Sequence, residues 1–250
     1  MGYVLMQFCA VYRGGISLYT FEKSRFERCD TMKKFYAING SPRKDWNTAQ
    51  LLDKALEGAK ASSPDEEVVT ERIDLYDLTY SGCRSCFACK RIGGSSYGKC
   101  AVQDDLKEVL RKVMDSDGVI FGSPIYFGTI TGQLHSFFER LLFPITAYSS
   151  NREGLPEVKL PLAFIYTMNV TEEVFNKGWF NASLEAWERM LGRLSAKTSR
   201  LCAFNTYQFD DYSKYVSDAF SESDKAAYRR DHWNEDCGAA YRLGSEFYHL

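Results

Sequence analysis

This 250-residue chain lacks several features that would point directly to a class of function. Lys and Arg number 31 against 33 Asp and Glu, so neither sign of charge dominates and no basic block is available for nucleic acid. The longest apolar runs, such as residues 160–166, are far shorter than a bilayer requires. We therefore expect neither a nucleic-acid partner nor a membrane partner.

Signatures of common nucleotide sites and nucleophiles are missing as well. The sequence has no Gly-x-x-x-x-Gly-Lys-Ser/Thr loop for a nucleoside triphosphate and no Gly-x-Gly-x-x-Gly loop for a dinucleotide. Ser123 does not lie in a Gly-x-Ser-x-Gly elbow, which argues against a serine hydrolase. The three histidines have no partner at a catalytic spacing, so we do not expect a histidine to act as general base.

The sequence does contain a strand–turn–helix segment over residues 36–48. Residues 36–39 predict the end of a strand, residues 40–43 form a Gly-Ser-Pro-Arg turn, and a helix is expected to open at Asn47 or Thr48. Unpaired backbone N–H groups and the helix dipole would then point at one place. The side chains that can donate to an anion there are Ser41, Arg43, Asn47 and Thr48.

An ordinary connection with Asn47 as the N-cap is the simpler interpretation of this segment. The convergence of donors on the end of the helix dipole favours an anion site instead. Because the triphosphate and dinucleotide patterns are absent, a single phosphate monoester is the anion that fits best.

Apolar patterning predicts five strands that alternate with helices. The strands are expected at residues 35–38, 68–73, 118–122, 160–168 and 201–206. The helices are expected from residue 47 and over residues 104–113, 131–142, 183–194 and 224–248. This alternation predicts an α/β fold with a parallel sheet that is covered on both faces. Ligands of such sheets lie beyond the carboxyl ends of the strands, at the switch point of the strand order.

A second loop, residues 123–132, follows the third strand at the same edge of the sheet. In the strand order 2-1-3-4-5 the first and third strands are neighbours, so both loops share one crevice. Pro124 stiffens this loop, Tyr126 and Phe127 offer flat surfaces, and Gly128 permits a close approach of the backbone. Taken alone, Tyr126 and Phe127 fit a role in capping the core equally well. Beside a phosphate site they favour a planar aromatic ring.

Together these motifs resemble a known family. Gly40-Ser41-Pro42-Arg43 with Asn47-Thr48, and Ser123-Pro124-Ile125-Tyr126-Phe127-Gly128 with Gly132, are similar to the flavodoxin-like NAD(P)H-dependent FMN reductases, most of all to the branch that includes the iron–sulfur flavoproteins. The resemblance covers residues 33–145 well and the remainder only by its strand–helix pattern. It implies a flavodoxin-like three-layer sandwich with a five-stranded parallel sheet of order 2-1-3-4-5, and FMN as the cofactor. The cofactor-binding residues that it implies are Ser41, Pro42, Arg43, Asn47, Thr48, Ser123, Pro124, Ile125, Tyr126, Phe127, Gly128, Thr167 and Asn169.

Four cysteines, Cys83, Cys86, Cys89 and Cys100, lie between the second predicted strand and the helix at residue 104. A Cys-x2-Cys-x2-Cys run suits a cubane cluster, and Cys100 is then the candidate fourth ligand. The resemblance to iron–sulfur flavoproteins implies a [4Fe–4S] cluster here, although ten residues, 90–99, separate the third and fourth cysteines. A zinc site, a redox-active dithiol and a loop that binds nothing in a flavin-only protein remain alternatives.

The function expected from this resemblance is the transfer of electrons from NAD(P)H to a small acceptor such as a quinone or a flavin. FMN would carry the chemistry, and no side chain need be catalytic. The alternatives are an FMN electron-transfer protein, with or without the cluster, that serves protein partners, and a redox-sensing or zinc-stabilised interaction protein. We expect a cytoplasmic homo-oligomer with residues 32–250 as the FMN-binding domain and residues 1–31 as a poorly ordered extension.

Overall fold

The structure is a computed structural model, and it describes residues 32–62, 67–148, 150, 155, 159–195 and 198–246. The predicted extension, residues 1–31, lies outside these ranges, and so do the last residues of the predicted final helix. The division of the chain at residue 32 therefore stays a prediction.

Five strands form one parallel sheet in the part of the chain that the structure describes. Their order is β2-β1-β3-β4-β5, as predicted. The α/β, flavodoxin-like arrangement is thereby confirmed. The strands are β1 (Lys33–Asn39), β2 (Val68–Asp74), β3 (Gly118–Pro124), β4 (Leu162–Thr167) and β5 (Thr198–Ala203).

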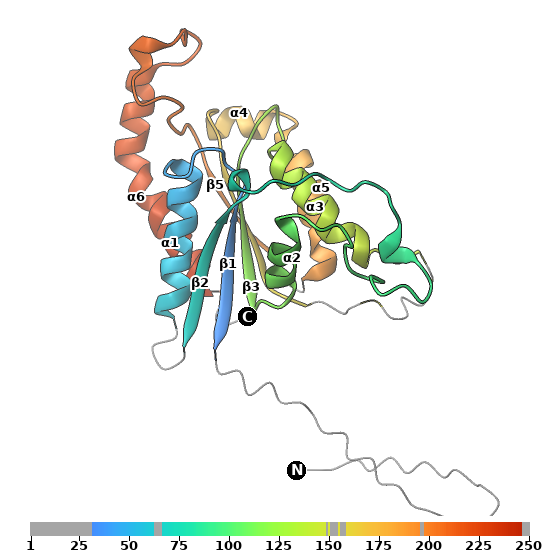
Figure 1. Ribbon diagram of the computed structural model, residues 1–250. Helices are drawn as coiled ribbons and strands as arrows, with labels where there is room; N and C mark the ends of the chain where they lie inside the picture. The colour runs from blue at the N-terminus through green and yellow to red at the C-terminus, as the bar shows by residue number, and fades with distance from the viewer. Residues whose placement is uncertain are drawn as a thin grey trace, which may run out of the picture. The chain divides into compact units, whose positions relative to one another are not determined.

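Helices cover both faces of this sheet (Figure 1). One face carries α1 (Asn47–Ala61) and α6 (Glu222–Glu246), and the other carries α2 (Leu106–Met114), α3 (Gly132–Ile145) and α5 (Phe180–Leu191). The short helix α4 (Glu172–Lys177) follows β4 and was not predicted, because its six residues are too few to show a helical period. Short 3-10 turns occur at Leu75–Asp77, Ala88–Lys90, Gly192–Leu194 and Tyr212–Lys214.

Alternating side chains explain why the central strands carry helices on both sides. In β1, Phe35 and Ala37 pack in the cluster under α1 and α6, whereas Tyr36 and Ile38 pack in the cluster under α2, α3 and α5. The second cluster is rich in aromatic rings, and Phe121 of β3 lies at its centre against rings of α3 and β4. The central strands β1, β3 and β4 are thereby buried on both faces, as their near-continuous apolar sequences predict, whereas the edge strands β2 and β5 are mostly half-buried.

Helices α1 and α6 touch backbone to backbone. An added Cβ at Gly58 of α1 would lie 2.0 Å from the carbonyl oxygen of Tyr241. One at Gly244 of α6 would lie 1.8 Å from the carbonyl oxygen of Ala55. Helix α6 is largely polar and has few apolar side chains to pack against α1. The two glycines let the backbones of α1 and α6 come into direct contact instead.

Strand β5 begins and ends three residues earlier than predicted, at Thr198–Ala203 instead of 201–206. Polar residues at its start gave no strand signal. The Arg200 side chain is accommodated by Glu188 of α5, whose carboxylate oxygens lie 2.7 Å from Nε and Nη2. Residues 204–208 consequently belong to the loop after the strand, which reaches the carboxyl edge of the sheet.

Candidate functional site

The loop between β1 and α1 is fixed to the loop after β3 by main-chain contacts. The Gly40 N–H donates to the carbonyl oxygen of Gly122 at 2.8 Å, and the Gly40 carbonyl accepts from Thr131 Oγ1 at 2.7 Å. A Cβ at position 40 would lie 2.9 Å from Leu134 Cβ, so the close approach requires glycine. The two loops that the sequence placed in one crevice are thus held together.

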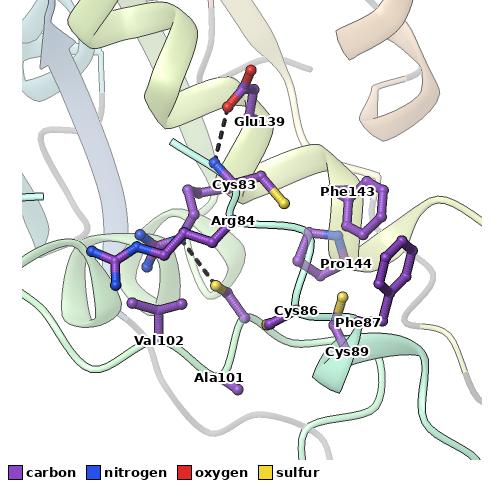
Figure 2. A pocket seen from close by; sticks show the side chains of 12 residues that line it. Cys83, Arg84, Cys86, Phe87, Cys89, Ala101, Val102, Glu139, Phe143 and Pro144 are labelled. Carbon is purple, nitrogen blue, oxygen red and sulfur yellow. Dashed lines mark hydrogen bonds between the residues drawn. The ribbon is translucent and has the colours of Figure 1, made fainter. Parts of the chain in front are cut away.

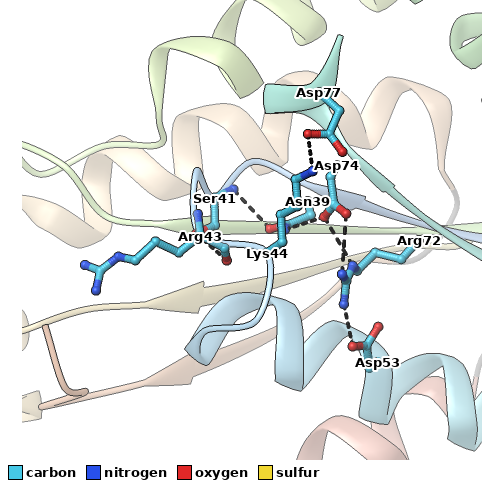
Figure 3. A network of polar contacts seen from close by, with 8 residues as sticks. All are labelled: Asn39, Ser41, Arg43, Lys44, Asp53, Arg72, Asp74 and Asp77. Carbon is cyan, nitrogen blue, oxygen red and sulfur yellow. Dashed lines mark hydrogen bonds and ion pairs between the residues drawn. The ribbon is translucent and has the colours of Figure 1, made fainter. Parts of the chain in front are cut away.

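A partly buried polar network shapes the first loop (Figure 3). Asn39, at the end of β1, accepts from the Ser41 N–H at 3.0 Å and donates to Asp74 at 2.7 Å. Arg72 of the edge strand β2 pairs in turn with Asp74. The Ser41 hydroxyl accepts from the Arg43 N–H at 3.1 Å, which closes the turn. These bonds hold the turn in place and leave the Arg43 side chain exposed beside it.

Helix α1 begins at Asn47, within the predicted range. Trp46 is its N-cap residue in an extended conformation, and no side chain caps the helix among the described residues. The amides of its first turn have no partner within the helix, so they carry the positive end of the dipole. Asn47 itself is engaged: its Nδ2 donates to the Tyr207 carbonyl at 2.8 Å, and its Oδ1 accepts from Arg229 at 2.9 Å.

The loop after β3 contains a tight reversal. Tyr126 and Thr129 exchange main-chain hydrogen bonds of 2.9 and 3.1 Å. The reversal places Phe127 and Gly128 at positive φ, 50° and 78°. Phe127 is 98% exposed, and Gly128 faces Trp179, whose ring a Cβ would meet at 2.3 Å. The aromatic ring of Trp179, which precedes α5, therefore covers this end of the loop.

One cavity, named here the switch-point cavity, lies between the two loops at the carboxyl edge of the sheet. Nine of the predicted site residues line it: Ser41, Arg43, Asn47, Thr48, Pro124, Ile125, Tyr126, Thr167 and Asn169. Pro42, Ser123, Phe127 and Gly128 are not among its lining residues. Ser123 instead shapes the second loop, because its hydroxyl donates to the Pro124 carbonyl at 2.8 Å and accepts from the Thr131 N–H at 3.1 Å.

Sequence reasoning missed part of the lining. The additional residues are Trp46, Thr206, Tyr207 and Gln208, whereas Met168 lines the cavity between the predicted residues Thr167 and Asn169. Three of these, residues 206–208, follow β5, whose end was predicted too late in the chain. Trp46 could have been predicted as a lining residue, because it directly precedes the start of the helix. In the structure the centroid of its ring lies 5.2 Å from the Arg43 guanidinium carbon.

Two features of the cavity wall leave polar groups for a ligand. Thr48 Oγ1 and Thr167 Oγ1 lie 2.7 Å apart, so one of these hydroxyls donates to the other and the second keeps its proton free. The Oδ1 atom of Asn169 is buried, and no hydrogen-bond partner for it occurs among the described residues. A buried carbonyl oxygen without a partner is an acceptor site for a bound N–H or O–H group.

The buried ammonium group of Lys225 lies next to the cavity-lining residue Asn169. Lys225 of α6 is 1% exposed, and its Nζ donates to the Asn169 carbonyl at 2.9 Å and to Asn205 Oδ1 at 2.8 Å. Burial lowers the pKa of Lys225 to about 8. The residue thereby ties α6 to the loops after β4 and β5, and it places positive potential beside the cavity.

The four cysteines line a second cavity, named here the cysteine cavity (Figure 2). Ser85 and Phe87 adopt left-handed conformations, with φ of 52° and 56°, which turn the chain between successive cysteines. Cys89 is buried, and desolvation raises the pKa of its thiol. The insert of residues 90–99 brings Cys100 back to the same cavity.

Residues on α3 hold both ends of the cysteine run. Glu139 accepts from the Cys83 N–H at 2.9 Å, and Arg140 Nε lies 3.0 Å from Cys100 Sγ. Among the residues that the structure describes, no three His, Cys, Asp or Glu side chains are grouped closely enough to hold one metal ion. In the same ranges, no helix is long and apolar enough to cross a membrane.

Comparison with known proteins places this geometry in a family. The sequence profile described as NADPH-dependent FMN reductase matches residues 33–165, just over half of the chain. An iron–sulfur flavoprotein of Methanocaldococcus jannaschii is 38% identical over 107 residues, which cover 43% of this chain and 51% of that protein. One from Clostridioides difficile is 34% identical over 128 residues, covering 46% and 54%. The chain thus spans about half the length of the curated relatives it matches.

Solved structures share the fold. An NAD(P)H:quinone oxidoreductase from Methanothermobacter marburgensis has a TM-score of 0.61 at 16% identity, with 88% of this chain and 98% of that chain covered. An azoreductase from Bacillus anthracis has a TM-score of 0.59 at 16% identity, with 86% and 100% covered. On the evidence of the profile match and of its two loops, the chain belongs to the flavodoxin-like NADPH-dependent FMN reductase family.

Proposed function

We propose that the protein is an FMN-dependent oxidoreductase that takes electrons from NAD(P)H and passes them to a small acceptor such as a quinone or a free flavin. The observation that supports this most strongly is the switch-point cavity, where the start of α1, Arg43 and the loop after β3 meet. Membership of the family supports it further, and so do the names of the proteins that share the fold.

The lining residues suit FMN. Ser41, Arg43 and the first turn of α1 would hold the monophosphate, since hydroxyl, guanidinium and free amides all donate there. The cavity wall at Pro124 and Tyr126 would lie against the ring system, and the unpartnered Asn169 oxygen would accept from a ring N–H. When bound, FMN supplies the hydride and electron chemistry, while these side chains bind and orient it.

The first test is reduction of the bound flavin under anaerobic conditions. We expect NADPH or NADH to bleach the flavin absorbance and, with a quinone added, to be oxidised with ping-pong kinetics. Dithionite provides the control for a reducible flavin. A flavin that dithionite reduces, but neither nicotinamide nucleotide reduces, would refute the reductase activity and leave an electron carrier.

The second candidate is an electron-transfer protein in which FMN works with a [4Fe–4S] cluster in the cysteine cavity. Four thiols from two segments face that cavity, which supports a four-thiolate ligand set. In a cubane each thiolate binds a different iron, whereas in a zinc site all four bind one ion. The iron–sulfur flavoproteins among the relatives favour the cluster over zinc.

Iron and labile-sulfide analysis of anaerobically purified protein tests this second candidate. We expect about four of each per chain, and we expect Cys86→Ser to lose them. Cys237→Ser, which changes a half-buried thiol of α6, is the matched control and should keep the iron. One zinc per chain, or no metal at all, would contradict the cluster and leave the zinc-stabilised or the metal-free alternative.

A further inference from the structure

Among the residues that the structure describes, Arg140 of α3 is the largest side chain that is almost fully buried, with 1% of it exposed. Its guanidinium has a partner on every side. Nη1 and Nη2 donate to the Asp104 carboxylate at 2.8 and 3.0 Å, Nη1 also donates to the Ser81 carbonyl at 3.0 Å, and Nε points at Cys100 Sγ from 3.0 Å. A buried arginine with such a set of partners has a fixed orientation.

The ion pair alone has a structural explanation, because Asp104 precedes α2 and the pair ties α2 to α3. That explanation does not require Nε to face a cysteine. The bidentate contact of Nη1 and Nη2 with Asp104 fixes the plane of the guanidinium. The remaining nitrogen, Nε, then points at Cys100. The arrangement directs a cationic N–H donor at the one cysteine that lies far along the sequence from the other three.

Helix α3 also connects the two cavities. Thr131, its N-cap residue, donates to the Gly40 carbonyl beside the switch-point cavity. Arg140 lies further along the same helix, about 12 Å from its first residue at 1.5 Å per residue. The rigid element that positions the flavin loops therefore also positions Cys100.

We propose that Arg140 is a positioning residue of the cysteine cavity, which orients Cys100 as the remote fourth ligand and raises the reduction potential of a cluster bound there. This inference rests on the cluster proposed above. A hydrogen bond from a cationic donor to a ligand sulfur stabilises the reduced state, which carries one more negative charge. Removing the donor should therefore shift the potential to more negative values.

The test compares anaerobically purified wild-type protein with the double variant Arg140→Gln/Asp104→Asn. This variant removes both charges together, so that neither remains buried without its partner. The matched control is Arg200→Gln/Glu188→Gln, which removes a similar part-buried ion pair between the edge strand β5 and α5. Iron and sulfide content are measured first, and the cluster potential is then followed by electron paramagnetic resonance during a redox titration.

We expect the double variant to keep its cluster with a more negative potential, equivalent to a tenfold or larger shift of the redox equilibrium, which is about 59 mV for one electron. The control should match the wild type. If the double variant does not fold, Arg140→Lys takes its place, since lysine keeps the charge at Asp104 but cannot also direct a second donor at Cys100. An unchanged potential in the folded variant would overturn this inference alone, whereas a wild-type protein without iron would overturn the cluster and the inference together.

Discussion

Replacing Arg43 and Thr48 together by Ala should weaken FMN binding by at least about 100-fold, because each replacement removes a hydrogen bond to a charged phosphate worth about 1.5–3 kcal/mol. Arg43 is exposed at the mouth of the switch-point cavity and its guanidinium lies over the Trp46 ring, so it is placed to meet a phosphate. Thr48 lines the cavity in the first turn of α1. The measurement is the dissociation constant of FMN for the apoprotein, from fluorescence quenching.

Lys44→Ala is the matched control for this double variant. Lys44 carries the same charge in the same loop, but it pairs with Asp77 and does not line the cavity. FMN binding to the control should change little. If the double variant binds FMN as tightly as the wild type while remaining folded, the assignment of the phosphate to this loop is wrong.

Gly244→Val should destabilise the protein by about 3 kcal/mol or more, the upper part of the range for overpacking, because the obstacle is backbone and cannot move aside. Even a Cβ at this position would lie 1.8 Å from the Ala55 carbonyl oxygen. Helix α6 would have to lift from α1, and it carries Lys225 and Arg229, whose contacts hold the loops around the switch-point cavity. We therefore expect flavin loss together with the lower midpoint in urea unfolding.

Gly238→Ala provides the comparison on the same helix. The nearest atom to its Cβ would be Arg242 Nη1 at 3.3 Å, the end of a flexible side chain. Alanine is favoured over glycine in a helix interior by about 1 kcal/mol, so this variant should be as stable as the wild type or more stable. Equal unfolding midpoints for Gly244→Val and Gly238→Ala would show that the close contact between α1 and α6 does not form.

The sequence predicted those parts of the fold whose signals are local. Apolar patterning located β1 and β3, and the switch-point rule then placed their two loops in one crevice. Strand β5 was placed three residues too late in the chain, because its polar start gave no strand signal. That start is stabilised by Glu188 of α5, a tertiary partner that no local pattern predicts. That error assigned Thr206 to the strand, and the next two residues, Tyr207 and Gln208, were not assigned to the cavity wall that they help to complete.

Other functional features depend on contacts that no sequence pattern marks. Lys225 lies in a polar helix, so its sequence context predicts an exposed side chain. In the structure it is buried and donates to the carbonyl of Asn169. Arg140 likewise lies among the apolar residues of α3. The role proposed for it depends on its contact with Cys100, which no sequence pattern predicts. Predicting either residue requires the packing of helices that lie far apart in the sequence.

The central claim is that the turn after β1 binds the monophosphate of FMN. It is tested most directly by titrating the apoprotein with FMN and with riboflavin, which differ only in that phosphate. We predict that FMN binds at least about 100-fold more tightly, since the phosphate contacts of Ser41, Arg43 and the α1 amides are lost with riboflavin. Equal affinity for the two flavins, or no binding of either, would contradict the account.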